Sequence, residues 1–190
     1  MVLPLTFYGN PVLRKKGARV GDITPTILQL IADMIETMDA SHGVGLAAQQ
    51  VGAELQLTVL DVRGMKDRPS TMSINGSEAD VEEHMPLVLI NPEIQPMGDK
   101  VVGSEGCLSF PEIFGEIERR AEVEVTATNA KGKRWTFRCG GLLARAVQHE
   151  FDHLQGILFI DRMEREVKSE IKPELEELQA KTKAELKRSK

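Results

Sequence analysis

Apolar residues recur at helical spacing in two segments of the chain. Thr24 and Pro25 suit the N-cap and first turn of a helix, and the pattern that follows ends by Gly43. The apolar positions of this first helix are Ile27, Leu28, Ile31, Met34, Ile35 and Met38. A second amphipathic pattern predicts a helix over residues 142–154, with Gly156 as its C-terminal cap.

Alternating and continuous apolar runs predict β-strands between these helices. Residues 55–62 and 87–90 have the composition of strands, and residues 122–128 alternate between apolar and polar positions. A turn sequence at residues 129–132 then leads back into residues 135–137, which predicts a hairpin. Strands and helices are mixed without a regular strand–helix–strand repeat. The fold class we expect is therefore α+β.

Two polar stretches complete the chain. Residues 64–86 predict a long surface loop between two strands. Residues 164–190 are rich in helix formers, and Pro173 suits the first turn of a new helix. The apolar stripe of that helix is thin and consists of Ile171, Leu175, Leu178 and Leu186. We expect a main domain at residues 1–163 followed by a solvated helical tail.

Composition and charge narrow the class of protein. The chain has 190 residues with a net charge of −5, and its acidic balance argues against a dedicated, sequence-specific nucleic-acid binder. No run of about 18 apolar residues appears, so we expect no membrane span. The first residues lack the features of a secretory signal or a transit peptide, and two cysteines are too few for a disulfide framework. We expect a reducing, cytoplasmic location.

The strongest local signal is the segment 149–153, which has the sequence H-E-F-D-H. Residues four apart share one face of a helix, so His149 and His153 can bind one divalent cation. Glu150 would then face a water at the metal. The alternative is a pair of ordinary histidines on a half-buried helix.

A metal site needs a third protein ligand, and the residues leave several candidates. A metzincin would have a third histidine where this chain has Phe159, which excludes that class. A glutamate from a following helix is another solution, with the candidates Glu170, Glu174 and Glu177. The remaining candidate is Cys107, because a thiolate is a good ligand for Zn²⁺ or Fe²⁺. A lone cysteine can also be a small buried apolar residue.

A glycine- and alanine-rich segment, residues 43–52, permits close approach of another backbone. It lacks the glycine spacing of a dinucleotide site and the lysine of a P-loop. One interpretation is that Gln50 offers its amide to an oxyanion near the metal. The other is tight packing of a helix end on a sheet, with Gln50 bonded to backbone.

Together the three segments resemble the peptide deformylases. That family carries G-x-G-x-A-A-x-Q, E-G-C-L-S and H-E-x-x-H in this order, and the chain has them at residues 43–50, 105–109 and 149–153. The resemblance covers residues 5–163 and implies an α+β fold in which β-sheets surround the H-E-x-x-H helix. It implies removal of the formyl group from the N-terminal formyl-methionine of new proteins, with release of formate. N-formyl-methionyl nascent peptides would be the substrates.

The resemblance also assigns roles at the metal. It implies Cys107, His149 and His153 as ligands of one cation, usually Fe²⁺ in this family, with Zn²⁺, Ni²⁺ or Co²⁺ as substitutes. Glu150 is implied as the general base that then becomes the general acid. The Gln50 side chain and the backbone N–H of Leu108 are implied to stabilise the oxyanion.

Substrate-binding residues follow from the same resemblance. Val44, Leu142 and Ala146 would line an apolar methionine pocket beside His149. Gly43 and Gly45 would let the peptide backbone lie close, and Glu105 would order the loop around Cys107. Arg145 and His42 depart from the residues common in the family, which leaves the preference beyond formyl-methionine open. Arg119 and Arg120 are candidates to pair with Glu105, or else mark a solvated strand end.

Two other functions compete with the one that the resemblance implies. One is a metallopeptidase of another type, which would cleave internal peptide bonds and use a ligand other than Cys107. The other is a non-enzymatic protein with a structural zinc closed by Cys107, Cys139, His149 and His153. A further hypothesis is a weak contact of the basic end of the tail, residues 181–190, with the ribosome.

Overall fold

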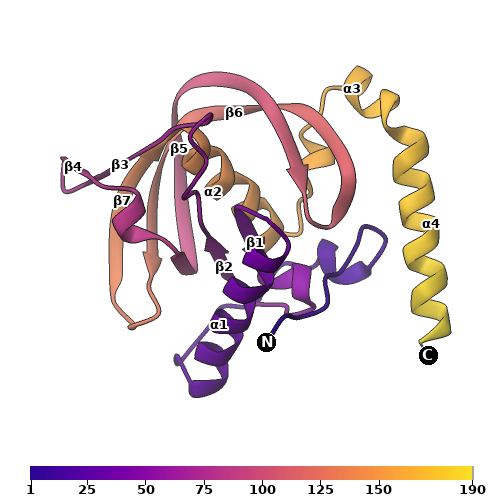
Figure 1. Ribbon diagram of the computed structural model, residues 1–190, viewed down its shortest axis with the longest axis horizontal. Helices are drawn as coiled ribbons and strands as arrows, with labels where there is room; N and C mark the ends of the chain where they lie inside the picture. The colour runs from indigo at the N-terminus through magenta and orange to yellow at the C-terminus, as the bar shows by residue number, and fades with distance from the viewer. Residues whose placement is uncertain (190) are drawn as a thin grey trace.

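Helix α2 (Gly141–Leu154) lies at the centre of the structure, a computed structural model that describes residues 1–189. A single antiparallel sheet bends around it, in the order β1 (Gly45–Ala47), β2 (Leu57–Leu60), β5 (Leu87–Cys107), β6 (Phe110–Thr128), β7 (Arg134–Gly140), β3 (Ser70–Ile74) and β4 (Ser77–Ala79). Figure 1 shows the long strands β5 and β6 arching around α2. The expected α+β class, with the H-E-x-x-H helix inside a sheet, is confirmed.

Side chains on α2 explain its central position. Leu143 and Val147 are almost fully buried and pack with Val123, Val125 and Phe137 of the sheet. The apolar positions of residues 122–128, which the alternating pattern places on one face of the strand, therefore point at this helix. Nearly every α2 residue is buried, so its polar side chains must find partners inside the protein.

Helix α1 (Pro25–Ala40) begins and packs as its sequence predicts. The Thr24 hydroxyl accepts a hydrogen bond from the Ile27 N–H, and Pro25 occupies the first turn. Its buried residues Ile31, Met34 and Met38 pack on the short strands β1 and β2. Those strands contact α2 on their other side. The glycine-rich segment is thereby held between the two helices.

The strand predicted at residues 87–90 is far longer than its apolar core. β5 continues to Cys107 and pairs with β6 almost throughout. The pairing shifts register near Ile90, near Met97 and between Gly106 and Cys107, and such bulges let a strand bend sharply. The last of these shifts lies at Cys107 itself, where it changes the direction in which that side chain points.

The prediction that residues 64–86 form one long surface loop is wrong. Within it β3 and β4 form a hairpin, and β3 extends the sheet by pairing with β7. Asn75 and Gly76 both have positive φ angles of 53° and 78°, as a tight two-residue hairpin turn requires. The Asn75-Gly76 dipeptide favours such a turn. The flanking residues, however, are too polar to show the apolar alternation that would predict strands.

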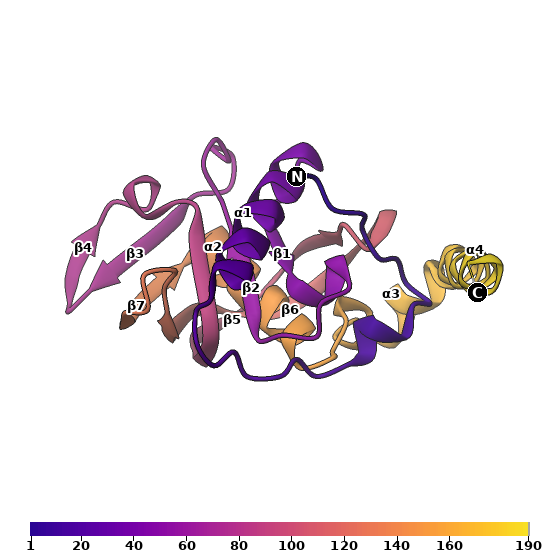
Figure 2. The same ribbon diagram turned by 90° about the horizontal axis from the view of Figure 1, so that it is seen from below.

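The C-terminal tail forms two helices, α3 (Arg165–Glu170) and α4 (Lys172–Arg188), with Pro173 in the first turn of α4. The expectation of a solvated helix is only partly right. Leu175 and Thr182 are each 6% exposed, and Leu175 belongs to a buried cluster with Phe110, Ile117 and Phe159. Figure 2 shows α4 end-on at the side of the molecule opposite the β3–β4 hairpin.

None of the helices within residues 1–189 combines the length and apolar character needed to cross a membrane.

Candidate metal centre and active site

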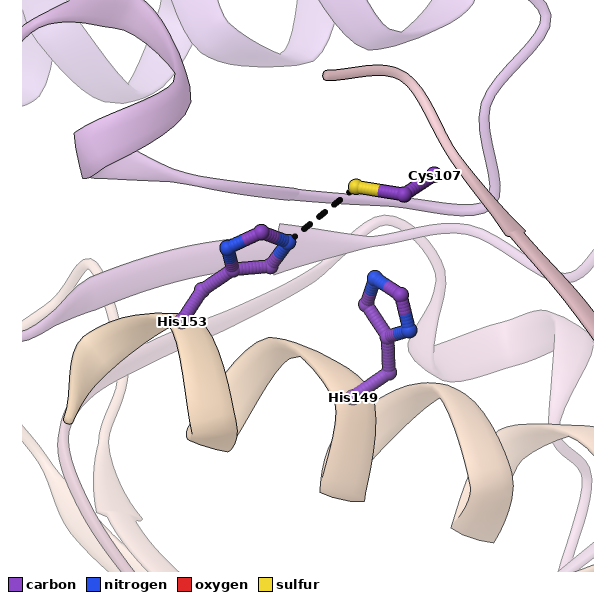
Figure 3. A group of neighbouring side chains, drawn as sticks. All are labelled: Cys107, His149 and His153. Carbon is purple, nitrogen blue, oxygen red and sulfur yellow. Dashed lines mark hydrogen bonds between the residues drawn. The ribbon is translucent and has the colours of Figure 1, made fainter. Parts of the chain in front are cut away.

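Three potential metal ligands converge between α2 and the end of β5. The ligand atoms of Cys107, His149 and His153 all lie within 4.8 Å of one another. The Cys107 Sγ is 3.3 Å from the His153 Nε2. In Figure 3 the two imidazoles come from successive turns of α2 and lie on the side that faces the cysteine. Among the described residues this is the group whose donors could hold an ion.

The chemistry of these donors fits a divalent transition metal. One thiol and two imidazoles are suitable ligands for Fe²⁺ or Zn²⁺ and leave further coordination positions open. Burial acts to lower the pKa of His149, but the neighbouring Cys107 and Glu105 hold that pKa well above its usual value. Burial and the charge of His149 lower the pKa of His153. Metal binding therefore displaces a proton from the centre.

A carboxylate fixes the orientation of one ligand. The His149 Nδ1 lies 2.8 Å from the Glu105 Oε1, so this ring nitrogen is occupied and Nε2 is left for a metal. Burial acts to raise the pKa of Glu105, but hydrogen bonds from His149 and Arg119 outweigh it and leave the pKa well below its usual range. Glu105 is therefore an anion placed to align His149, which differs from the ordering of the Cys107 loop that the resemblance implies.

Glu150 follows His149, one of the three candidate metal ligands, and has one unpartnered oxygen. Its side chain is 4% exposed, and its Oε2 is buried without a hydrogen-bond partner from the protein. Burial raises the pKa of its carboxyl to about 7. A Cβ added to Gly45 would lie 2.5 Å from the Glu150 Oε1, so only glycine leaves room for this carboxylate. A buried carboxylate with a pKa near neutrality is suited to accept and return a proton.

Gln50 lies next to Cys107 and is held at both ends of its amide. Its Oε1 accepts a hydrogen bond from the Ala47 N–H at 2.9 Å. Its Nε2 donates to the Ser109 Oγ at 3.1 Å and lies 3.5 Å from the Cys107 Sγ. The amide nitrogen therefore faces Cys107, one of the candidate metal ligands. Ser109 was not singled out from the sequence, although it is the last residue of the E-G-C-L-S motif.

One cavity of about 530 Å³ joins these groups to solvent. Every predicted site residue except His153 lines it. These are Gly43, Val44, Gly45, Gln50, Glu105, Cys107, Leu108, Leu142, Ala146, His149 and Glu150. His153 is 1% exposed and is not among the lining residues. The sequence did not indicate Phe110 and Phe114, which also line the cavity, because they follow the E-G-C-L-S motif without a pattern of their own.

Several alternatives from the sequence are excluded by the geometry. Cys139 is buried in β7 within the apolar core and does not join the ligand group, so the four-ligand structural zinc is wrong. Burial raises the pKa of its thiol to about 12. The tail glutamates do not join the group either. Of the two arginines considered as partners of Glu105, Arg119 pairs with it, whereas Arg120 is exposed and donates to the Gly98 carbonyl.

A helix with H-E-x-x-H inside an antiparallel sheet, together with a thiol from a neighbouring strand, defines a metal-dependent hydrolase. The family model of polypeptide deformylase matches residues 2–169. The chain belongs to this family. A peptide deformylase of Methylacidiphilum infernorum is 49% identical over 178 residues, which cover 94% of this chain and 93% of that protein.

Solved structures agree with this assignment. The crystal structure of a peptide deformylase from Thermotoga maritima has a TM-score of 0.73 and 39% identity, with coverage of 86% of this chain and 99% of that one. A plant peptide deformylase superimposes with a TM-score of 0.82 at 35% identity, over 96% of this chain and 92% of that one. The fold implied by the three motifs is therefore confirmed.

Proposed function

We propose that this chain removes the N-formyl group from the N-terminal formyl-methionine of newly synthesised proteins, at the centre formed by Cys107, His149 and His153. The observation that carries the proposal is the unpartnered carboxylate oxygen of Glu150 in the cavity that Cys107 and His149 line. The family, whose members are named for deformylation of peptides, supports the reaction.

The residues divide the chemistry between them. A divalent cation held by Cys107, His149 and His153 supplies Lewis acidity, which polarises a carbonyl and makes water a stronger acid. Glu150 accepts the proton of the attacking water and delivers it to the leaving amine. The Gln50 amide and the Leu108 backbone N–H donate to the oxygen that gains negative charge. Formate and a free amino terminus are the products.

The cavity walls suit the methionine that follows the formyl group. Val44, Leu142 and Ala146 give the inner cavity an apolar lining. Burial of a methionine side chain there contributes about 2 kcal/mol to binding by the ordinary hydrophobic scale. Gly43 and Gly45 would let the substrate backbone lie close, since neither carries a side chain. The protein needs glycine at both positions in any case, because an added Cβ would lie 2.7 Å from a Leu108 side-chain carbon or 2.5 Å from the Glu150 Oε1.

Substrate comparison tests the reaction. We expect formate release from a formyl-methionyl tripeptide and no hydrolysis of the acetylated peptide of the same sequence. Cleavage of internal bonds in a longer peptide, without formate release, would favour the rival metallopeptidase.

We propose Fe²⁺ as the native metal, with Zn²⁺, Ni²⁺ or Co²⁺ as substitutes. The thiol and two imidazoles support Fe²⁺ and Zn²⁺ about equally, and the family resemblance favours Fe²⁺. Protein purified without oxygen should contain iron and lose activity in air as Cys107 is oxidised. Zinc with air-stable activity in the same preparation would contradict this assignment.

Residues 1–163 would carry the chemistry, and residues 164–190 a separate role. The exposed charges Lys181, Lys183, Lys187 and Arg188 on α4 support a weak electrostatic contact with the ribosome. Removing α4 would uncover the cluster that Leu175 helps to bury, so substitution of these four residues by glutamine is the better test. Co-sedimentation of this variant with ribosomes at low salt that equals that of the wild type would contradict the proposed contact. Nascent substrates and two free cysteines support a cytoplasmic location.

A further inference from the structure

Arg145 is a buried arginine one helical turn before His149. It is 7% exposed, whereas arginine is almost never buried unless its charge is paired. The sequence marks Arg145 only as a departure from the residues common in the family. The guanidinium extends from α2 to the β5–β6 pair, and the residue also lines the cavity.

Three hydrogen bonds hold the guanidinium in place. Its NH1 donates to the Glu105 Oε2 at 2.8 Å and to the Ile117 carbonyl at 2.9 Å. Its NH2 donates to the Val101 carbonyl at 2.8 Å. A Cβ on Gly103 would lie 3.0 Å from the Arg145 Cζ, so glycine in β5 leaves space for the group. Arg145 therefore joins α2 to both long strands and to Glu105.

The Glu105 carboxylate receives four donors, two on each oxygen. Its Oε1 is 2.9 Å from the Arg119 NH2 and 2.8 Å from the His149 Nδ1. Its Oε2 is 2.9 Å from the Arg119 Nε and 2.8 Å from the Arg145 NH1. Arg119 also donates to Asp152 at 2.6 Å, on the side away from Glu105. Arg119 thus divides its hydrogen bonds between two carboxylates, whereas Glu105 is the one carboxylate among the described residues to which Arg145 donates.

We propose that Arg145 is a positioning residue for the metal centre. It fixes Glu105, and through Glu105 it fixes the imidazole of His149 with Nε2 directed to the site shared with Cys107 and His153. The inference rests on the proposed function, since it takes these three residues as the ligands. Arg145 acts through another side chain and has no role in the proton transfers.

The metal itself reports on this role. In Co²⁺-loaded protein, Arg145→Met should shift the visible d–d bands and weaken Co²⁺ binding about 10-fold in chelator competition, the lower end for loss of a group that orients a ligand. Arg145→Lys should recover part of both, because lysine can donate to Glu105 but not also to both carbonyls. Arg138→Met is the control, since Arg138 makes an exposed pair with Glu124 on the sheet.

A double-substitution cycle separates positioning from general support of the fold. If Arg145 acts through Glu105, adding Arg145→Met to Glu105→Gln should leave Co²⁺ affinity unchanged within about 2-fold. Independent losses in the double variant would overturn the proposal, as would an Arg145→Met protein with lowered Tm but native Co²⁺ spectrum and affinity. If Arg145→Met does not fold, Arg145→Lys decides by the same two readouts.

A separate variant tests whether Cys107 is a metal ligand, independently of the role of Arg145. Cys107→Ser should remove the intense thiolate-to-Co²⁺ charge-transfer band. If that band survives, the metal lies elsewhere and the proposed function fails, whatever the Arg145 variants show.

Discussion

Glu150 is the residue whose burial has the most direct energetic consequence. The residue is 4% exposed, and burial raises the pKa of its carboxyl from the ordinary 4.5 to about 7. At about 1.4 kcal/mol for each pKa unit, ionising this group in the folded protein costs about 3 kcal/mol. Glu150→Gln removes the ionisation and keeps the shape. The metal-free variant should therefore be more stable than the metal-free wild type above neutral pH, although it is inactive.

The sign of the pH dependence follows from the raised pKa. Below the unfolded-state value of about 4.5 the carboxyl is protonated in both states, and the two proteins should have similar stability. As pH rises towards 7, the unfolded chain loses this proton first, so the wild type loses stability relative to the variant. The difference should reach its full size above about pH 7.

Urea unfolding of chelator-treated protein at several pH values measures this difference. Glu177→Gln, an exposed carboxylate on α4, is the matched control and should track the wild type. A stability difference between Glu150→Gln and wild type that stays constant from about pH 5 to about pH 8 would show that folding does not raise the pKa of Glu150.

Three further outcomes follow from the same geometry. Cys139→Ser should keep the metal and the activity, because Cys139 lies in the core outside the ligand group; loss of metal would revive a structural zinc. Gly45→Ala places a Cβ 2.5 Å from the Glu150 Oε1 and should lower formate release at least about 10-fold at unchanged metal content. In the wild type, kcat/KM should fall as the pH drops through the pKa of Glu150. That pKa should be about 7 or lower in the active enzyme, because a bound cation favours the ionised carboxylate. Metal content measured at each pH separates this loss of activity from release of the metal.

The local elements of the fold could be predicted because short-range chemistry decides them. Thr24 and Pro25 fix the start of α1, and the alternation over residues 122–128 gives the face of β6 that packs on α2. The length of β5 could not be predicted, because its outer half is polar and is held by backbone pairing to β6. The β3–β4 hairpin could not be predicted either, because its strands are also polar and are held by backbone pairing.

The candidate site shows the same division. The spacing of His149 and His153 is visible in the sequence, but Cys107 is far away along the chain and only the resemblance selected it over the tail glutamates. The contact of Arg145 with Glu105 is harder still to predict, because a lone arginine in a helix gives no sign that it will be buried against a carboxylate. Tertiary contacts of this kind depend on where bulges direct the strands.

Glu150→Gln, purified without oxygen beside the wild type, provides the most direct test of the central claim. Metal content and formate release from a formyl-methionyl peptide are measured on the same samples. We expect about one metal per chain in both proteins. Formate release should be lower by about 1,000-fold or more in the variant, within the range for removal of a general base that also serves as the acid. Retained formate release in Glu150→Gln with its metal bound would show that Glu150 is not the general base.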